Sequence, residues 1–446
     1  MKPEPGGDDA HELYIPTTGK PSPRLTHYLF RYPAKFHPPV VRALLDRYSD
    51  VGDTVLDPFV GSGTLLVEAA VTGRHGIGTD VDPVAVAVAR AKVHRYNASA
   101  LSASCDAVVS KANTFARADT DYQALMKKDL SQPRYEWELL GVVDWVPAIP
   151  NLLHWFRRYV VIDLAFIRAV VETAAIPETH RDLLRVVFAS IIRNASNADP
   201  VPVSGLEVTA HMKRRDEAGR LINPFELFAS AVKKAVTAMK EFSEGAHVGS
   251  RQQVRLANAT KVARHVHQPI DAVITSPPYH GAVDYYRRHQ LEMFWLGHTE
   301  SQTDRLALLP NYIGRPKVAQ RDPLLQAESL DTTLAVRWEE RIREVSTQRA
   351  DAFRHYLIAM GRVFDQLSQV LKPGHPAIIV VGNSTWNGGR IPTSDLFQEI
   401  AREAFELREV LSYPVKNRYM SYTRHNGADI SREYVVVLSR TSSRRP

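Results

Sequence analysis

Four consecutive residues, Ser276-Pro277-Pro278-Tyr279, combine groups that could hold and orient an amino group. They follow an apolar segment, 271–275 (DAVIT), that we predict to be a strand, so the loop falls at a strand's carboxyl end, where open α/β sheets bind ligands. The Ser276 hydroxyl and the Pro277 carbonyl can both accept hydrogen bonds from one amino group and so direct its lone pair at an electrophile. Tyr279 offers a face on which an extruded base could stack. The alternative is a proline-rich loop with a packed tyrosine.

A second candidate is the glycine loop DPFVGSGT, residues 57–64, between a predicted strand (54–57) and a predicted helix that begins at Thr64. Glycines let a ligand approach the backbone, and a helix N-terminus offers free N–H donors. Asp80 ends the next predicted strand, where a carboxylate can bind a ribose diol. The alternatives are a dinucleotide site, which would want a third glycine, and a tight turn without a ligand.

Strand and helix patterns alternate around these loops, which predicts a mostly parallel sheet with helices on its faces and an antiparallel edge strand. We expect a flexible tail over 1–24. The predicted catalytic domain combines three segments, namely 25–97, 251–296 and 350–446. Helical periodicity dominates 98–250, which we predict to be a helical insertion, and 297–349 forms a smaller polar insertion. Either insertion could recognise DNA.

The bulk composition is that of a globular protein with a polyanionic partner. The chain has 446 residues, 44% of them hydrophobic, and a formal net charge of +7, which suits phosphate binding. Cys105 is the only cysteine, so neither an intrachain disulfide nor a multi-cysteine metal site is possible, and we expect no metal. Because the sequence has neither a signal-peptide pattern nor an apolar run of about 18 residues, we expect a cytoplasmic protein that does not enter a membrane.

The two motifs together resemble the S-adenosylmethionine-dependent DNA amino-methyltransferases, whose cofactor motif has the form D-P-F-x-G-S-G-T. The resemblance covers most of 25–97 and 251–440. It implies a Rossmann-like methyltransferase fold, S-adenosylmethionine as cofactor and Ser276, Pro277, Pro278 and Tyr279 as the catalytic loop. The implied cofactor-binding residues are Lys35, Phe36, Asp57, Pro58, Phe59, Gly61, Gly63, Thr64, Asp80 and Asn258. Asn258 stands where the family usually has an Asp that contacts the adenine amino group.

Within this family, serine at the first loop position is commoner among cytosine-N4 enzymes, so the resemblance favours N4 of a flipped-out cytosine over N6 of adenine. An RNA amino-methyltransferase uses similar loops, whereas a protein-glutamine methyltransferase would be expected to have Asn at position 276. A non-catalytic DNA-binding specificity subunit that keeps the fold is the alternative from another class. We expect double-stranded DNA as the partner, and any restriction endonuclease would be a separate chain.

Basic and polar residues in the insertions and near the C-terminus are candidates for DNA contacts, since Arg and Lys grip phosphates or guanine edges and Ser can serve the backbone. These candidates are Arg193, Ser196, Lys213, Arg214, Arg315, Lys317, Arg418 and Arg424. A solvated surface is the alternative for each cluster. Trp155, Phe156 and Tyr159 occur at helical spacing, which predicts core packing rather than stacking on bases.

Overall fold

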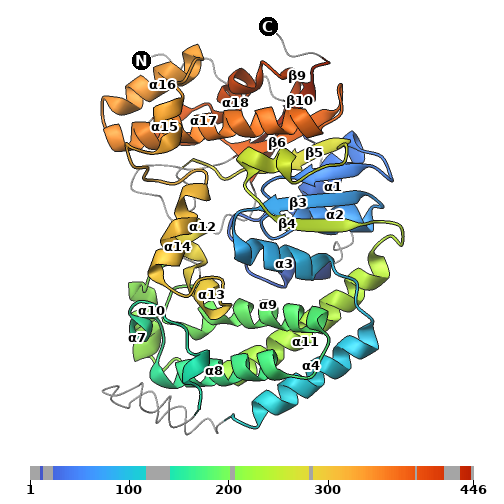
Figure 1. Cartoon of the computed structure of the whole chain (residues 1–446), viewed down its shortest axis with the longest axis vertical. Coiled ribbons are helices and arrows are strands. Elements are labelled where there is room, and N and C mark those ends of the chain that lie inside the picture. Colours follow the sequence, from blue (N-terminus) through green and yellow to red (C-terminus); the bar gives the residue numbers. More distant parts are fainter. Residues whose placement is uncertain are drawn as a thin grey trace.

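The protein is described from a computed structural model (Figure 1). The structure describes residues 11–13, 24–116, 141–200, 206–280, 285–386, 389–415 and 432–442. No helix in these ranges is long and apolar enough to cross a membrane.

Within the described residues, eight strands form one sheet in the order β1-β9-β10-β6-β5-β2-β3-β4. Their bounds are β1 (His11–Glu12), β2 (Thr54–Asp57), β3 (His75–Asp80), β4 (Gln252–Leu256), β5 (Ala272–Thr275), β6 (Pro376–Gly382), β9 (Phe405–Pro414) and β10 (Arg432–Arg440). The strands from β4 to β6 pair in parallel, whereas β10 pairs antiparallel with both β6 and β9. The predicted mostly parallel sheet is therefore confirmed, but the antiparallel strand β10 lies between β6 and β9 rather than at an edge of the sheet.

Helices cover both faces of the sheet, as the alternation of side chains along its strands requires. Val55 and Ile378 point into a core with α1 (Pro38–Tyr48) and α2 (Thr64–Val71). Their neighbours Leu56 and Ile379 point into the opposite core with α17 (Thr347–Val370) and α18 (Thr393–Ala401). Both faces of the central strands are thus buried, which explains their continuous apolar runs.

The helical segment 98–250 packs against the sheet domain through one shared core. Its helices are α4 (Ala98–Asn113), α7 (Leu152–Trp155), α8 (Arg158–Thr173), α9 (Glu178–Ala195), α10 (Ala210–Glu217) and α11 (Pro224–Gly245). This core also takes in residues of α3 (Pro83–Val93) and α13 (Gln290–Trp295). In Figure 1 these helices form the lower part of the molecule, and α3 lies between them and the sheet. Phe156 and Tyr159 are buried in this core as expected, whereas Trp155 is half-buried at its margin.

Shorter elements complete the fold. They are α12 (Tyr285–Arg288), α14 (Gln302–Leu308), α15 (Pro323–Ala327), α16 (Thr333–Arg343), β7 (Ser384–Trp386), β8 (Gly389–Ile391) and the 3-10 turns Leu25–Tyr28, Val143–Trp145, Ala259–Arg264 and Leu309–Asn311. The short helices α12 and α13 are separate because His289 between them, the N-cap of α13, has a non-helical backbone. The polar segment 297–349 contains α14, α15, α16 and the first residues of α17.

Residues 11–13 differ from the expected flexible tail. His11 and Glu12 form β1, which pairs in parallel with Leu411 and Ser412 of β9, and Leu13 is buried. Two residues are too few to show a strand periodicity, so the sequence contains no signal for this pairing.

Candidate active site

The two sequence motifs meet where the strand order of the sheet reverses. From β2 the chain proceeds outward through β3 and β4, whereas β5 lies on the other side of β2 and leads to β6. Ligands of open α/β sheets bind in the crevice outside the strand ends at such a point. The glycine loop follows β2 and the Ser-Pro-Pro-Tyr loop follows β5, so both loops border this crevice.

A short hydrogen bond joins the two motifs. The Thr275 hydroxyl at the end of β5 donates to Oδ1 of Asp57 at the end of β2 over 2.6 Å, and the Phe59 backbone N–H donates to the same oxygen. Burial raises the pKa of Asp57 to about 7, and these hydrogen bonds oppose the rise. Asp57 therefore fixes the distance between the two loops.

The glycine loop has the shape of an anion-binding turn. Gly61 and Gly63 have φ angles of +47° and +79°, a region that favours glycine, and Gly63 is the N-cap of α2. A Cβ on Gly63 would lie 3.0 Å from the Cβ of Ala89, so the loop also packs closely on α3. The buried hydroxyls of Ser62 and Thr64 have no hydrogen-bond partner among the described residues. Buried polar groups normally have one, so both hydroxyls are available to a ligand at the start of α2.

Asp80 closes the second side of the crevice. Its two carboxylate oxygens accept hydrogen bonds from the backbone N–H groups of Gly61 (2.9 Å) and Asp82 (3.0 Å). Burial, and next the nearby Asp82 carboxylate, raise the pKa of Asp80 to about 7, while the two backbone hydrogen bonds act in the opposite direction. The carboxylate is thus oriented by the backbone and keeps lone pairs for a ligand.

The Asp82 carboxylate makes hydrogen bonds within the protein. Its side chain accepts from the backbone of Val84 and Ala85 as the N-cap of α3, and its other oxygen lies 2.7 Å from Nδ1 of His289. The pair joins α3 to the segment that follows the Ser-Pro-Pro-Tyr loop.

The segment before α1 lies over the same crevice. The Lys35 ammonium donates to the His27 carbonyl over 3.1 Å and lies 4.2 Å from the centre of the Tyr28 ring. Burial lowers the pKa of Lys35 to about 8. Phe36 lines the crevice beside it, and so does Tyr32, whose ring a Cβ on Gly61 would meet at 3.1 Å.

The loop after β5 is held by partners on distant strands. Ser276 and Pro278 line the crevice, and Pro277 between them is buried. The Tyr279 hydroxyl donates to Oε1 of Glu433 on β10 over 2.7 Å, which fixes the plane of the ring. Burial raises the pKa of Tyr279 well above its usual value, so its hydroxyl stays protonated.

One pocket brings together most of the residues that the sequence singles out. These are Lys35, Phe36, Asp57, Pro58, Phe59, Gly61, Thr64, Asp80, Asn258, Ser276 and Pro278. Gly63, Pro277 and Tyr279 lie in the adjoining backbone. Tyr32, from the same segment as Lys35 and Phe36, also lines the pocket. Further lining residues that the sequence did not indicate are Asp82, Tyr285, Asn311, Tyr312 and Ile313. Of these, Asn311–Ile313 carry no motif that could have indicated them.

Asn258 lines the pocket, but its amide oxygen is already engaged. That oxygen accepts from both the backbone N–H and the hydroxyl of Thr260, each at 2.9 Å, and the amide nitrogen donates to Asn311 over 3.4 Å. Because an amide oxygen has two lone pairs and both are used here, Asn258 cannot also accept a hydrogen bond from an adenine amino group in this arrangement.

The candidate DNA contacts fall into four groups. Lys213, Arg214 and Lys317 are exposed. Arg193 and Ser196 are buried, because the Arg193 guanidinium donates to the carbonyls of Asp199 and Arg288, and the Ser196 hydroxyl donates to the Arg193 carbonyl.

Arg315 is paired with Asp322 over 3.0 Å. The prediction that Arg193 and Ser196 contact DNA is wrong, because both side chains are buried. Arg418 and Arg424 lie outside the described residues.

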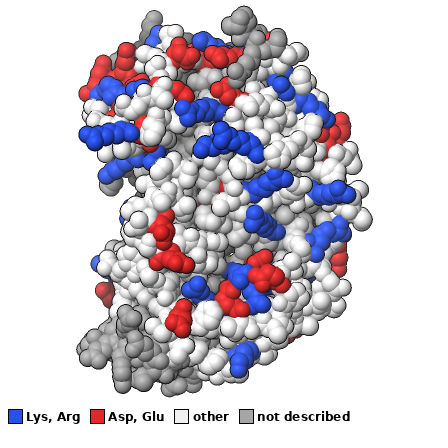
Figure 2. Space-filling model, in the orientation of Figure 1, with Lys and Arg blue, Asp and Glu red and all other residues white. Residues whose placement is uncertain are grey.

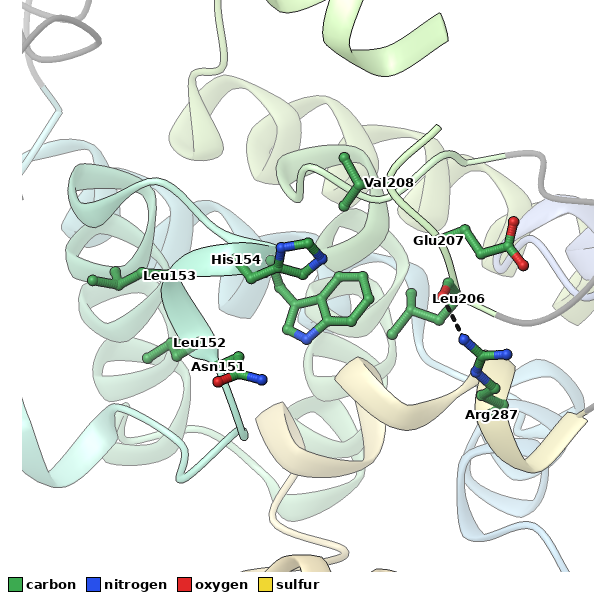
Figure 3. A pocket seen from close by; sticks show the side chains of 9 residues that line it. Asn151, Leu152, Leu153, His154, Leu206, Glu207, Val208 and Arg287 are labelled. Carbon is green, nitrogen blue, oxygen red and sulfur yellow. Dashed lines mark hydrogen bonds between the residues drawn. The ribbon is translucent and has the colours of Figure 1, made fainter. Parts of the chain in front are cut away.

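A separate groove lies on the helical segment (Figure 3). Its lining residues include His154, Trp155, Leu206, Glu207 and Arg287. Arg287 donates to the Leu206 carbonyl over 3.4 Å. None of the predicted site residues lines this groove.

Comparisons with known proteins agree with the geometry. A family model described as DNA methylase, N6_N4_Mtase, matches residues 4–91. The type II methyltransferase M.MjaII of Methanocaldococcus jannaschii is 21% identical over 66% of this chain and 66% of its own length. M.MvaI of Kocuria varians is 20% identical over 93% of this chain and 91% of its own length, and M.BsoBI of Geobacillus stearothermophilus is 22% identical over 88% and 80%. These matches show that the chain is similar to DNA amino-methyltransferases, as the two sequence motifs suggest.

The amino-methyltransferase cofactor is S-adenosylmethionine, as the sequence motifs predict. The pocket residues fit it. The start of α2, with the unpartnered hydroxyls of Ser62 and Thr64, suits a carboxylate, and Asp80 suits a ribose diol. The close approach of Tyr32 and Ala89 to Gly61 and Gly63 leaves no room for larger side chains in the loop.

Proposed function

We propose that this chain is a site-specific DNA methyltransferase that transfers a methyl group to N4 of a flipped-out cytosine. The observation that carries the proposal is the shared pocket: Ser276 and Pro278 open into the same space as the glycine loop and Asp80. The Thr275–Asp57 hydrogen bond holds the two loops at a fixed separation. Such an arrangement places an amino group and a methyl donor side by side, which converts a bimolecular reaction into an intramolecular one.

In this mechanism the chain's own residues orient the nucleophile. The amino nitrogen of a base is a poor nucleophile because its lone pair is delocalised into the ring. The Ser276 hydroxyl and the Pro277 carbonyl accept its two N–H bonds and turn the lone pair out of the ring plane. Held by the glycine loop and Asp80, S-adenosylmethionine would supply an electrophilic methyl group on a positively charged sulfur and would leave as a neutral thioether. The nitrogen, once methylated, would release one proton to solvent.

The Tyr279 ring supports the extruded base. Its hydroxyl is tied to Glu433, which also interacts with the Tyr413 hydroxyl, so the ring cannot swing away when a base stacks on it. Stacking of this kind contributes about 1–3 kcal/mol, which offsets part of the cost of unstacking the base from the duplex.

Duplex DNA fits the side of the molecule on which the pocket lies. The pocket-lining Tyr285 belongs to α12, at the left of the sheet in Figure 1. Figure 2 shows the outline hollowed on this side, with Lys and Arg side chains along the upper rim of the hollow. The exposed Lys213, Arg214 and Lys317 are the predicted contacts that such a partner could reach. The type II relatives suggest a restriction-modification setting, in which a separate endonuclease would act on the same DNA sequence.

The Ser276→Ala variant tests the assignment of the catalytic loop. We expect turnover on DNA to fall by about 10²-fold, since a hydrogen-bond acceptor aimed at the reacting group is lost. Cofactor affinity, measured by calorimetry, should be unchanged because the glycine loop and Asp80 are intact. Ser99→Ala, on the exposed surface of α4, is the matched control and should match the wild type. Unchanged turnover in Ser276→Ala, or a loss explained by weaker cofactor binding, would contradict the assignment.

A further inference from the structure

A four-residue stretch of the second insertion, Asn311–Gly314, runs through the active site. Asn311, Tyr312 and Ile313 all line the pocket. Gly314, with a φ of +81°, follows them and lies against the catalytic loop. A Cβ added to Gly314 would be 3.5 Å from the Tyr279 carbonyl oxygen. We call this stretch the strap. It contacts the cofactor side of the pocket and the catalytic loop at once.

The strap is anchored at both ends of its pocket-lining part. Asn311 accepts a hydrogen bond from Asn258, and the side chain of Ile313 packs on the core beneath α17. The Tyr312 ring lies edge-on to the Tyr286 ring, with 5.5 Å between centroids, in the core shared with the helical segment. Tyr312 is only 7% exposed, so its ring position is set by packing.

The Tyr312 hydroxyl is the one polar group of the strap that packing does not explain. It forms no hydrogen bond of normal geometry with a described residue. Burial, the charges of Asp82 and Asp80, and a hydrogen-bonding interaction with Asp82 raise the pKa of Tyr312, so the hydroxyl lies near the Asp82 carboxylate without a well-aligned bond to it. A buried hydroxyl normally has a partner. A hydroxyl that serves only to fill space would be replaced without loss by the ring of phenylalanine.

We propose that the Tyr312 hydroxyl binds the adenosyl part of the cofactor directly, beside Asp80, so that the second insertion supplies a cofactor-binding residue. This inference rests on the proposed function, because it requires S-adenosylmethionine in the pocket. It gives the insertion a role distinct from contacting DNA. The same strap lies against the catalytic loop through Gly314 and Tyr279.

Calorimetry on the full-length Tyr312→Phe protein tests the proposal. Loss of one hydrogen bond should weaken S-adenosylmethionine binding by about 3- to 12-fold, the change expected for a neutral hydrogen bond. Methylthioadenosine, which lacks the amino acid part of the cofactor, should lose affinity by the same factor. The melting temperature of the ligand-free variant should not fall, because the deleted hydroxyl makes no well-formed bond in the protein alone.

Tyr356→Phe is the matched control. Its hydroxyl is also buried without a partner among the described residues, but its ring lies in the core with α17, outside the pocket. Cofactor affinity in this control should equal that of the wild type. Equal affinity in Tyr312→Phe and wild type, equal losses in both variants, or a loss for S-adenosylmethionine without one for methylthioadenosine would each overturn the inference. Failure of the wild type to bind either ligand would instead overturn the proposed cofactor site, and the inference with it.

Discussion

Asp80→Asn separates the charge of the pocket carboxylate from its shape. Asparagine keeps one oxygen that can accept from Gly61 or Asp82, but it removes the negative charge that we expect to bind the ribose diol. A hydrogen bond to a charged group contributes about 1.5–3 kcal/mol, which corresponds to about 10- to 150-fold in affinity. We therefore expect cofactor affinity at pH 8 to fall by a factor in this range.

Cofactor affinity should depend on pH in the wild type but not in Asp80→Asn. Burial and the Asp82 charge raise the pKa of Asp80 to about 7 in the ligand-free protein, so the ionised acceptor is depleted below pH 7. Wild-type affinity should therefore fall as pH decreases from 8 to 6, by up to about tenfold for each unit below the pKa. The Asp80→Asn protein has no such carboxyl, so its affinity should change little over the same range, and the two curves should converge at low pH.

Isothermal titration calorimetry at pH 6, 7 and 8 measures this difference directly. Asp304→Asn, an exposed carboxylate on α14, controls for the change in net charge and should follow the wild-type curve. Melting temperatures of the ligand-free proteins report any loosening of the glycine loop caused by the lost backbone hydrogen bond. Parallel pH curves for wild type and Asp80→Asn would refute the reasoning, because a purely structural defect weakens binding equally at every pH.

Three further predictions follow from the loops around the pocket. Gly63→Ala should lower stability by about 1–3 kcal/mol and also lower cofactor affinity, because Gly63 has a positive φ and a Cβ added to it would lie 3.0 Å from the Cβ of Ala89. Thermal melting and calorimetry measure the two effects, and wild-type values would contradict the prediction. Lys92→Met should weaken cofactor binding about 3- to 10-fold without lowering the melting temperature, because it removes a buried amino group, with a pKa well below the usual value, that donates to the Ser62 carbonyl over 2.8 Å. A lower melting temperature with intact binding would argue against this. Burial raises the pKa of Asp57 from 3.8 to about 7, so the stability that its protonated form contributes is complete below pH 4 and is lost as pH rises through 7. In Asp57→Asn, the free energy of unfolding, measured by denaturant titration, should therefore vary less between pH 4 and pH 8, by up to about 4 kcal/mol. An unchanged pH profile would exclude the effect.

The central sheet and its two loops could be predicted from sequence because their signals are local. The end of a strand, a glycine turn and the first residue of a helix lie within a few residues of one another at Asp57–Thr64. The end of β5 and the two prolines likewise adjoin Ser276. Backbone geometry then requires both loops to meet at the strand order reversal. These parts depend on neighbouring residues alone.

The remaining features depend on contacts between distant segments. Glu433 binds Tyr279 across 154 positions in the sequence, and Tyr312 reaches the pocket from an insertion with no recognisable motif. Arg193 illustrates the opposite error. An arginine in a polar cluster suggests a surface contact, but here its guanidinium is buried and donates to backbone carbonyls that only the folded chain brings near. Residue type alone cannot distinguish these two environments.

The most direct test of the account is to identify the methylated product. The full-length chain is incubated with S-adenosylmethionine labelled in its methyl group and with mixed-sequence duplex DNA, which is then digested to nucleosides for mass spectrometry. Parallel reactions contain RNA or protein in place of DNA, and Ser276→Ala serves as the catalytic control. The account predicts labelled N4-methylcytosine from duplex DNA, strongly reduced in the control. Labelled N6-methyladenine would contradict the proposed base, and label found only in RNA or protein would contradict the account as a whole.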